Sequence, residues 1–268
     1  MKLLNKLIFA VIFSFSFVSC GNINSTFDDA YKTEEDKIYQ KLWESKTIYN
    51  ESCVMIENSD GGFSSRLVYK PSQIIEVKDY TLQHTYSPNE YKIEGDCIVM
   101  TKDSTMPFLT QDNIDCIIIP KSIGNYYEST RTKTGKILFT EDIGIIQHQV
   151  MVTYRTTENW YGSVPLKKGN KLPRLQKLLN NKEHIKYVCN GDSIFTGANS
   201  SGVKGIEPFL DPFPLGFAHE IERRYGSSVE YINTAVGGTV STWGRENVEA
   251  NINQYNPNLV VIGFGMND

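Results

Sequence analysis

The chain has 268 residues and a formal net charge of −4. Hydrophobic residues make up 40% of the chain, and aromatic residues make up 12% of it. This length allows one large domain or two ordinary ones, with enough apolar residues for real cores. An acidic balance without a basic stripe argues against a nucleic-acid partner, and equally against electrostatic capture on an anionic membrane.

The N-terminus has the pattern of an export signal. Positive charge in the first six residues is followed by an apolar stretch from Leu7 to Val18, which is too short for a comfortable transmembrane helix. The stretch ends in Ser19-Cys20-Gly21 and resembles a bacterial lipobox, although Phe17 stands where leucine is usual. The resemblance implies a signal peptide over residues 1–19 and lipidation of Cys20, which would anchor the protein in the bacterial cell envelope. The alternative is an ordinary secretory signal with a coincidental cysteine.

Residues 20–46 are polar and acidic, and we expect a flexible tether there. Residues 47–157 carry short alternating or β-branched runs separated by turn residues, which predicts an antiparallel β-sandwich of jelly-roll type. The expected strands cover residues 53–57, 66–69, 74–77, 91–94, 97–100, 116–119, 136–139 and 148–154. An exported compartment permits disulfides, whereas no Cys/His spacing indicates a metal site.

The pattern changes after residue 157. Residues 158–184 read as a linker with a short helix at 172–179, and residues 185–268 alternate apolar strands with helices. We expect strands at 185–189, 229–232 and 259–264 and helices at 214–225 and 246–255. This alternation predicts a parallel sheet with right-handed crossovers, so the fold class is α/β with a preceding β domain.

Candidate catalytic groups follow each of the three expected strands. Ser193 follows the first strand, Gly237-Gly238 the second, and Asn267 the third. In open α/β sheets, ligands and reacting groups gather at the carboxyl ends of the strands. Ser193 is therefore a candidate nucleophile, and Gly238 and Asn267 are candidate donors to an oxyanion. The alternative is a plain turn at the glycines and a helix cap at Asn267.

These three blocks in this order resemble the SGNH (GDSL-type) hydrolase family. Ser193 matches the nucleophile of the family's Gly-Asp-Ser block, Gly238 its oxyanion-hole glycine, and Asn267 the asparagine of its Gly-x-Asn-Asp block. The resemblance implies a flavodoxin-like domain, an oxyanion hole made by Ser193, Gly238 and Asn267, and no metal or cofactor. Asp192 is then expected to shape the turn rather than to transfer protons. The α/β-hydrolase alternative needs Gly-x-Ser-x-Gly, which does not occur in the chain.

The family's fourth block, Asp-x-x-His, has no counterpart in the sequence. None of the four histidines lies three residues after an aspartate, and all precede Asp268: His84, His148, His184 and His219. The chain therefore resembles the front part of such an enzyme, truncated before the block that carries the base. We expect the 1–268 polypeptide to show no esterase turnover, because an unassisted serine hydroxyl is a poor nucleophile.

A β domain followed by an SGNH domain resembles the two-domain carbohydrate esterases that remove acetyl groups from plant polysaccharides. The resemblance rests on the Trp160–Pro165 junction and on the stretch from Gly191 through Asn199 to Gly238. It implies an acylated polysaccharide or oligosaccharide as substrate, with Trp160, Tyr161 and Trp243 either stacking on sugar rings or packing at the domain junction and core. The alternatives are a non-catalytic glycan-binding lipoprotein with a degenerate domain, and a lipase for longer acyl chains.

Overall fold

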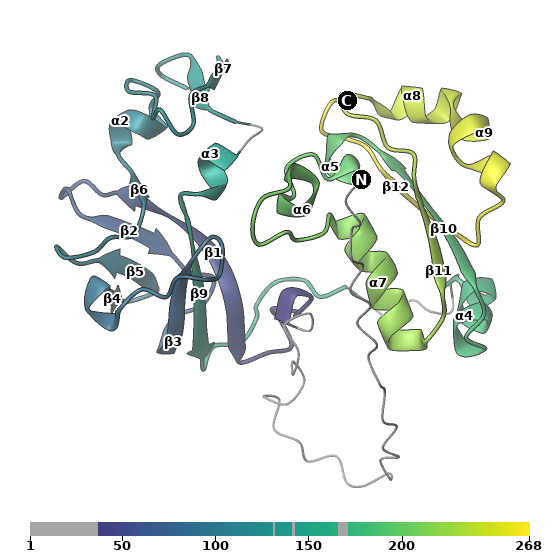
Figure 1. The fold of residues 1–268 in the computed structure, drawn as a ribbon, viewed down its shortest axis with the longest axis horizontal. Coiled ribbons are helices and arrows are strands. Elements are labelled where there is room, and N and C mark those ends of the chain that lie inside the picture. Colours follow the sequence, from purple (N-terminus) through teal and green to yellow (C-terminus); the bar gives the residue numbers. More distant parts are fainter. Residues whose placement is uncertain (1–36, 131, 141–142, 166–170) are drawn as a thin grey trace, which may run out of the picture.

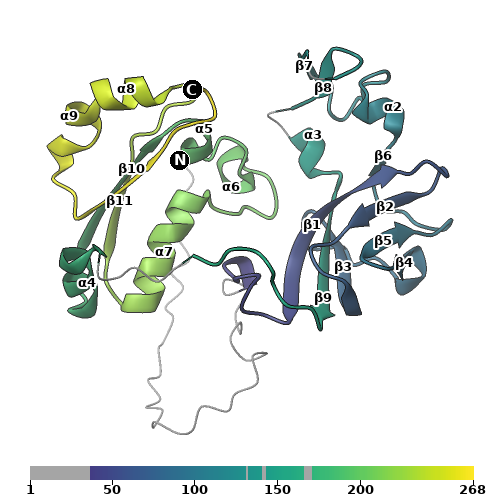
Figure 2. The same cartoon turned by 180° about the vertical axis from the view of Figure 1, so that it is seen from behind.

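The computed structural model describes residues 37–130, 132–140, 143–165 and 171–268. Two parts can be followed in Figures 1 and 2: a β part over residues 47–156 and an α/β part over residues 173–268. The expected signal peptide and the lipidation site Cys20 lie outside the described residues. No helix of the described ranges is long and apolar enough to cross a membrane.

The β part is built on one seven-stranded sheet in the order β3-β9-β1-β2-β5-β4, with β6 paired to β1. All of its pairs are antiparallel except that of β1 with β6. The strands are β1 (Thr47–Glu57), β2 (Phe63–Arg66), β3 (Pro71–Asp79), β4 (Tyr91–Glu94), β5 (Cys97–Met100), β6 (Phe108–Leu109) and β9 (Gln149–Thr156). The expected antiparallel β domain is thus present.

Strand β1 joins the two halves of this sheet. Its first residues pair with β9 and its last residues pair with β2 and β6, with an irregularity between Ile48 and Glu51. Both halves contribute to one core, with Met55 and Ile98 from one half and Val77 and Val150 from the other. Strand β1 is long enough to make the expected antiparallel sheet continuous.

Short elements extend the β part beyond the sheet. They are η2 (Pro88–Glu90), α2 (Gln111–Ile114), the hairpin β7 (Tyr126–Glu128) and β8 (Lys136–Leu138), and α3 (Ile143–Ile146). The expected strand at 116–119 is wrong. Thr110 and Asn113 form a capping box that begins α2, and Cys116 has a φ of 55°. Local capping therefore turns the chain before the isoleucines can pair, and Ile117 and Ile118 stay exposed.

The α/β part has a parallel three-stranded sheet in the order β11-β10-β12. Its elements are α4 (Pro173–Asn180), β10 (Ile185–Gly191), α5 (Ser193–Thr196), α6 (Ser201–Lys204), α7 (Phe213–Tyr225), β11 (Val229–Asn233), α8 (Ser241–Glu246), α9 (Val248–Asn251), η4 (Asn253–Tyr255) and β12 (Leu259–Gly263). The chain moves from β10 to one neighbour and then to the other side. This order, second-first-third, creates a topological switch point between β10 and β12.

Helix α7 covers one face of this sheet, while α8 and α9 lie on the other side (Figure 1). Alternate residues of β10, Ile185, Tyr187 and Cys189, pack in one cluster with Ala218 and Ile221 of α7. The remaining cluster residue, Leu179, comes from α4. The sheet is thus fixed from the side away from α8, and the carboxyl ends of its strands stay accessible.

Residues 37–46, here called the strap, lie between the two parts. Leu42 packs against the core of the β part, and its carbonyl accepts a 2.7 Å hydrogen bond from the Tyr69 hydroxyl. Tyr39 lies so close to α7 that a Cβ added to Gly216 would come within 2.3 Å of its hydroxyl. Of the segment expected to be a tether, the described residues therefore contact both parts of the chain.

Candidate active site

Ser193 lies at the carboxyl end of the central strand β10. Asp192 follows the strand as the N-cap of α5, and its carboxylate accepts a 2.9 Å hydrogen bond from the Ile194 N–H. Asp192 is only 2% exposed, whereas Ser193, the first residue of the helix, is half-buried. The carboxylate is thus occupied in shaping the turn that presents Ser193.

Two glycines let α5 sit directly on the sheet. A Cβ on Gly263 would lie 1.7 Å from the Phe195 ring, and one on Gly191 would lie 2.3 Å from the Gly263 carbonyl oxygen. The Asp192 N–H also donates to that carbonyl at 3.1 Å. The ring of Phe195 fills the space that side chains at both glycines would occupy. The position of Ser193 is thereby coupled to the ends of both β10 and β12.

The loop after β11 lies against Ser193. Its Val236 N–H donates to the Gly191 carbonyl at 2.9 Å, and a Cβ on Gly237 would lie 3.6 Å from the Ser193 Cβ. Gly238 has a φ of +76°, a conformation that residues with side chains rarely adopt. The two glycines thus form a tight turn whose backbone borders the candidate nucleophile.

The third block holds this loop in place. The Asn267 side-chain amide donates to the Thr239 carbonyl at 3.0 Å. Asp268 accepts hydrogen bonds from the Ser241 hydroxyl at 2.5 Å and from the Ser241 N–H at 2.9 Å. Those two bonds, led by the hydroxyl, lower the pKa of Asp268. The structure therefore brings Ser193, Gly238 and Asn267 into one region.

Two backbone hydrogen-bond donors in this region have no acceptor among the described residues. They are the N–H groups of Ser193 and Gly238. The Asn267 amide carries two hydrogens and uses one of them on Thr239, which leaves the other for a ligand. Such donors beside a serine hydroxyl can stabilise the oxyanion of an acyl-transfer reaction.

No histidine of the described ranges hydrogen-bonds to the Ser193 hydroxyl. His184 bonds to Ser228 at 2.9 Å, before the amino end of β10, so about 20 Å of strand separates it from Ser193. His219 pairs with Asp211 at 3.3 Å, with both side chains 40% exposed. The other two imidazoles belong to the β part, where His148 bonds to the Gly144 carbonyl and His84 packs against Tyr86.

Metal-ligating side chains do not gather anywhere in the described part of the chain. The cysteines Cys53, Cys97, Cys116 and Cys189 are free thiols there. Cys189 is buried in β10, and burial raises its pKa, which disfavours the reactive thiolate. This cysteine therefore packs as a small apolar residue, as expected from the apolar run around it.

Three residues that support the site were not singled out from the sequence: Phe195, Thr239 and Ser241. Ser241 is the first residue of α8, whose N-cap is Val240, so the pattern of a capping serine does not mark it. The contacts of Phe195 with the two glycines and of Thr239 with Asn267 join segments far apart in the chain, so no local pattern indicates them. Of the aromatic residues considered for stacking on sugar rings, Tyr161 is 91% exposed, and Trp243 packs edge-on against Phe264.

Comparisons with known proteins give one weak structural likeness. No family model matches the chain, and no curated protein matches it. Among solved structures, the chain is similar to a two-domain esterase active on acetylated mannans, co-crystallised with mannopentaose. The two share 24% identity and a TM-score of 0.32, over 37% of this chain and 26% of that one. The match thus spans about a quarter of that esterase.

Proposed function

We propose that this protein is an SGNH-type serine ester hydrolase that removes short acyl groups, above all acetyl groups, from carbohydrate. The observation that carries the proposal is the meeting of three strand ends around Ser193. Gly237 lies against Ser193, and Asn267 is hydrogen-bonded to the residue after Gly238. A nucleophile and oxyanion donors are the two components of acyl transfer that these residues can supply.

In the proposed reaction, the Ser193 oxygen attacks the ester carbonyl while a general base takes its proton. The N–H groups of Ser193 and Gly238 and the amide of Asn267 bind the resulting oxyanion. The alcohol then leaves with a proton from the conjugate acid, and water hydrolyses the acyl-enzyme by the same steps. In the family that the sequence resembles, the base is a histidine oriented by an aspartate, both from a block after the Gly-x-Asn-Asp block.

The test uses protein expressed from its complete gene, assayed with p-nitrophenyl acetate and with an acetylated polysaccharide. Ser193→Ala is expected to abolish turnover, and Asn267→Ala to lower kcat about 10²–10³-fold, the usual effect of removing one oxyanion donor. Ser228→Ala is the matched control, because Ser228 is exposed and bonds to His184 before β10 begins. Turnover that survives in Ser193→Ala would refute the assignment of the nucleophile.

The same assay separates the proposal from its alternatives. A lipase for long acyl chains would show kcat/KM rising from acetate to decanoate esters, whereas the proposal expects the reverse. A non-catalytic glycan-binding protein would hydrolyse none of them. The 1–268 polypeptide itself is expected to be inactive, because no histidine of the described residues bonds to Ser193.

The place of action that we propose is the bacterial cell envelope, with the membrane contacted through lipidated Cys20. Multiple acyl chains on one cysteine would give stable anchoring. Cys20→Ala is expected to shift the protein from the membrane fraction to the soluble fraction. A Cys20→Ala protein that still needs detergent for extraction would contradict this anchor.

A further inference from the structure

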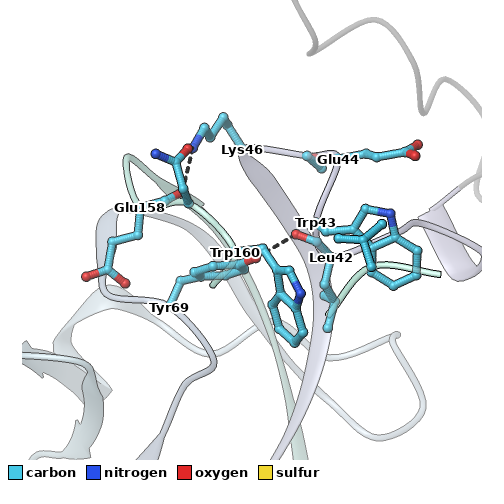
Figure 3. Close-up of a pocket in the computed structure, with 10 residues that line it drawn as sticks. Leu42, Trp43, Glu44, Lys46, Tyr69, Glu158 and Trp160 are labelled. Carbon is cyan, nitrogen blue, oxygen red and sulfur yellow. Dashed lines mark hydrogen bonds between the residues drawn. The ribbon is translucent and has the colours of Figure 1, made fainter. Parts of the chain in front are cut away.

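The strap and residues 158–164, together with Tyr69 of the β part, line a pocket that shares no residue with the site at Ser193 (Figure 3). Its volume is about 450 Å³, within the range of small-molecule sites. Trp43 and Trp160 both line it, so it holds two of the three tryptophans of the chain. Leu42, Tyr69 and Val164 complete its apolar lining.

The pocket walls are held by hydrogen bonds between distant segments. The Tyr69 hydroxyl donates to the Leu42 carbonyl at 2.7 Å, which joins the β part to the strap. Trp160 packs edge-on against Tyr69, with ring centroids 6.4 Å apart, and its indole N–H donates to the Ser163 carbonyl at 3.2 Å. The Trp160 indole is thus positioned before any ligand arrives, which reduces the entropy lost on binding.

The polar groups at the rim favour a neutral ligand over an anionic one. The Lys46 ammonium donates to the carbonyls of Thr157 and Glu158 and to the Asn159 side-chain oxygen, so its three N–H groups are in use. It has no N–H left for an anion. The Asn159 side-chain N–H₂ and the Trp43 indole N–H have no acceptor within the described residues, whereas the Glu158 carboxylate points away from both indoles and accepts from the Lys70 N–H (Figure 3).

We propose that this pocket is a carbohydrate-binding site, separate from the site at Ser193 and taking neutral sugars. Pyranose rings present an apolar C–H face, which fits the two indoles, and hydroxyl edges that both donate and accept hydrogen bonds. The amide of Asn159 and the Trp43 N–H serve as donors to those hydroxyls. The site places a glycan where the strap and the linker meet the β part.

Tryptophan fluorescence of the full protein tests the site, with neutral β-1,4-linked pentasaccharides of glucose and of mannose as probes. A Trp243→Phe background leaves only the two pocket tryptophans as emitters. A saturable change in emission is expected in this background. Trp43→Ala is expected to weaken binding about tenfold, the equivalent of one lost aromatic contact. Asn159→Ala is expected to weaken it about fivefold, the effect of one lost hydrogen bond.

Three controls separate loss of the binding site from misfolding and from binding at Ser193. Trp43→Phe retains an aromatic face and is expected to recover most of the affinity, while thermal melts confirm that Trp43→Ala stays folded. Ser193→Ala should bind both probes as the wild type does, whatever happens to hydrolysis. The proposal is overturned if neither pentasaccharide changes the emission up to about 10 mM, a concentration that would detect weak binding. Binding unaffected by Trp43→Ala, lost in Ser193→Ala, or tighter for a uronic-acid pentasaccharide would also overturn it.

Discussion

The β part has the larger apolar core, whereas the last strand of the α/β part and the residues after it carry apolar side chains at the surface. Ile98 and Val150 are fully buried, while Ile262 of β12 is 61% exposed and Met266 beyond it is 72% exposed. β12 pairs only with β10 among the described strands. The β part thus holds the larger buried apolar core. The α/β part instead has N–H groups at the carboxyl ends of its strands that find no acceptor among the described residues.

The largest expected effect on the free energy of unfolding comes from an isoleucine-to-alanine substitution in the β part, compared with the same substitution in the α/β part. Ile98→Ala should lower the free energy of unfolding by about 2–5 kcal/mol, because it leaves a cavity in a closed core. Ile262→Ala should change it by less than about 0.5 kcal/mol, because that side chain faces solvent. Urea denaturation of both variants measures the difference. Equal losses would contradict the contrast in burial.

A smaller effect is expected from removing a tyrosine hydroxyl in each part. Tyr154 donates to Glu51 at 2.7 Å and accepts from the Tyr69 N–H at 3.2 Å, so Tyr154→Phe should cost about 1–3 kcal/mol. The Tyr187 hydroxyl is buried and has no oxygen or nitrogen partner among the described residues, only the weakly bonding thiol of Cys189. Tyr187→Phe should therefore leave stability within about 0.5 kcal/mol of the wild type. If Tyr187→Phe lowers the free energy of unfolding by clearly more than this, the hydroxyl has a stronger partner in solution.

The smallest effects are opposite pH dependences of two carboxylates. Burial raises the pKa of Glu51 above 4.5, despite hydrogen bonds from Tyr154 and Val68. Its folded pKa exceeds the unfolded one, so stability is full below pH 4.5 and falls as pH rises through the folded value. At Glu220, burial also raises the pKa, but bonds from Arg223 and Arg224 outweigh it and lower the net value below 4.5. Stability from Glu220 is therefore full above pH 4.5 and is lost as pH falls.

Glutamine substitutions separate the two contributions. Glu51→Gln should remove a decline in stability on raising the pH above 4.5, and Glu220→Gln should remove a decline on lowering it below 4.5. Unfolding free energies measured between about pH 3 and pH 7 test both. Changes of the same sign in both variants would contradict the assigned causes.

Sequence patterns predicted the elements whose signals are local and strong. The runs before Ser193 and Gly265 became β10 and β12, because continuous apolar stretches suit strands buried in parallel sheets. The alternation of Val150, Val152 and Tyr154 predicted β9 for a similar reason. The strand expected at 116–119 failed because the polar cap at Thr110 determines the local backbone, and hydrophobicity alone does not register it.

The candidate site was only partly predictable. Its three blocks were visible through their resemblance to a family, but the interactions that hold them together were not. The bonds of Asn267 to Thr239 and of Asp268 to Ser241 span 28 and 27 residues. Packing of the strap against α7 likewise joins Tyr39 to Gly216, across most of the chain. Contacts of this kind depend on the tertiary fold and leave no periodic trace in the sequence.

The chain enters and leaves the β part at one place. Thr47, at the start of β1, pairs with Arg155 near the end of β9, and Lys46 bonds to the Thr157 carbonyl. The strap before this place contacts α7, so the β part is topologically an insertion between the strap and the α/β part. A short turn joining residues 46 and 157 would therefore suffice to excise it. In evolutionary terms, such a module can be exchanged at a single junction without rethreading the sheet that carries Ser193.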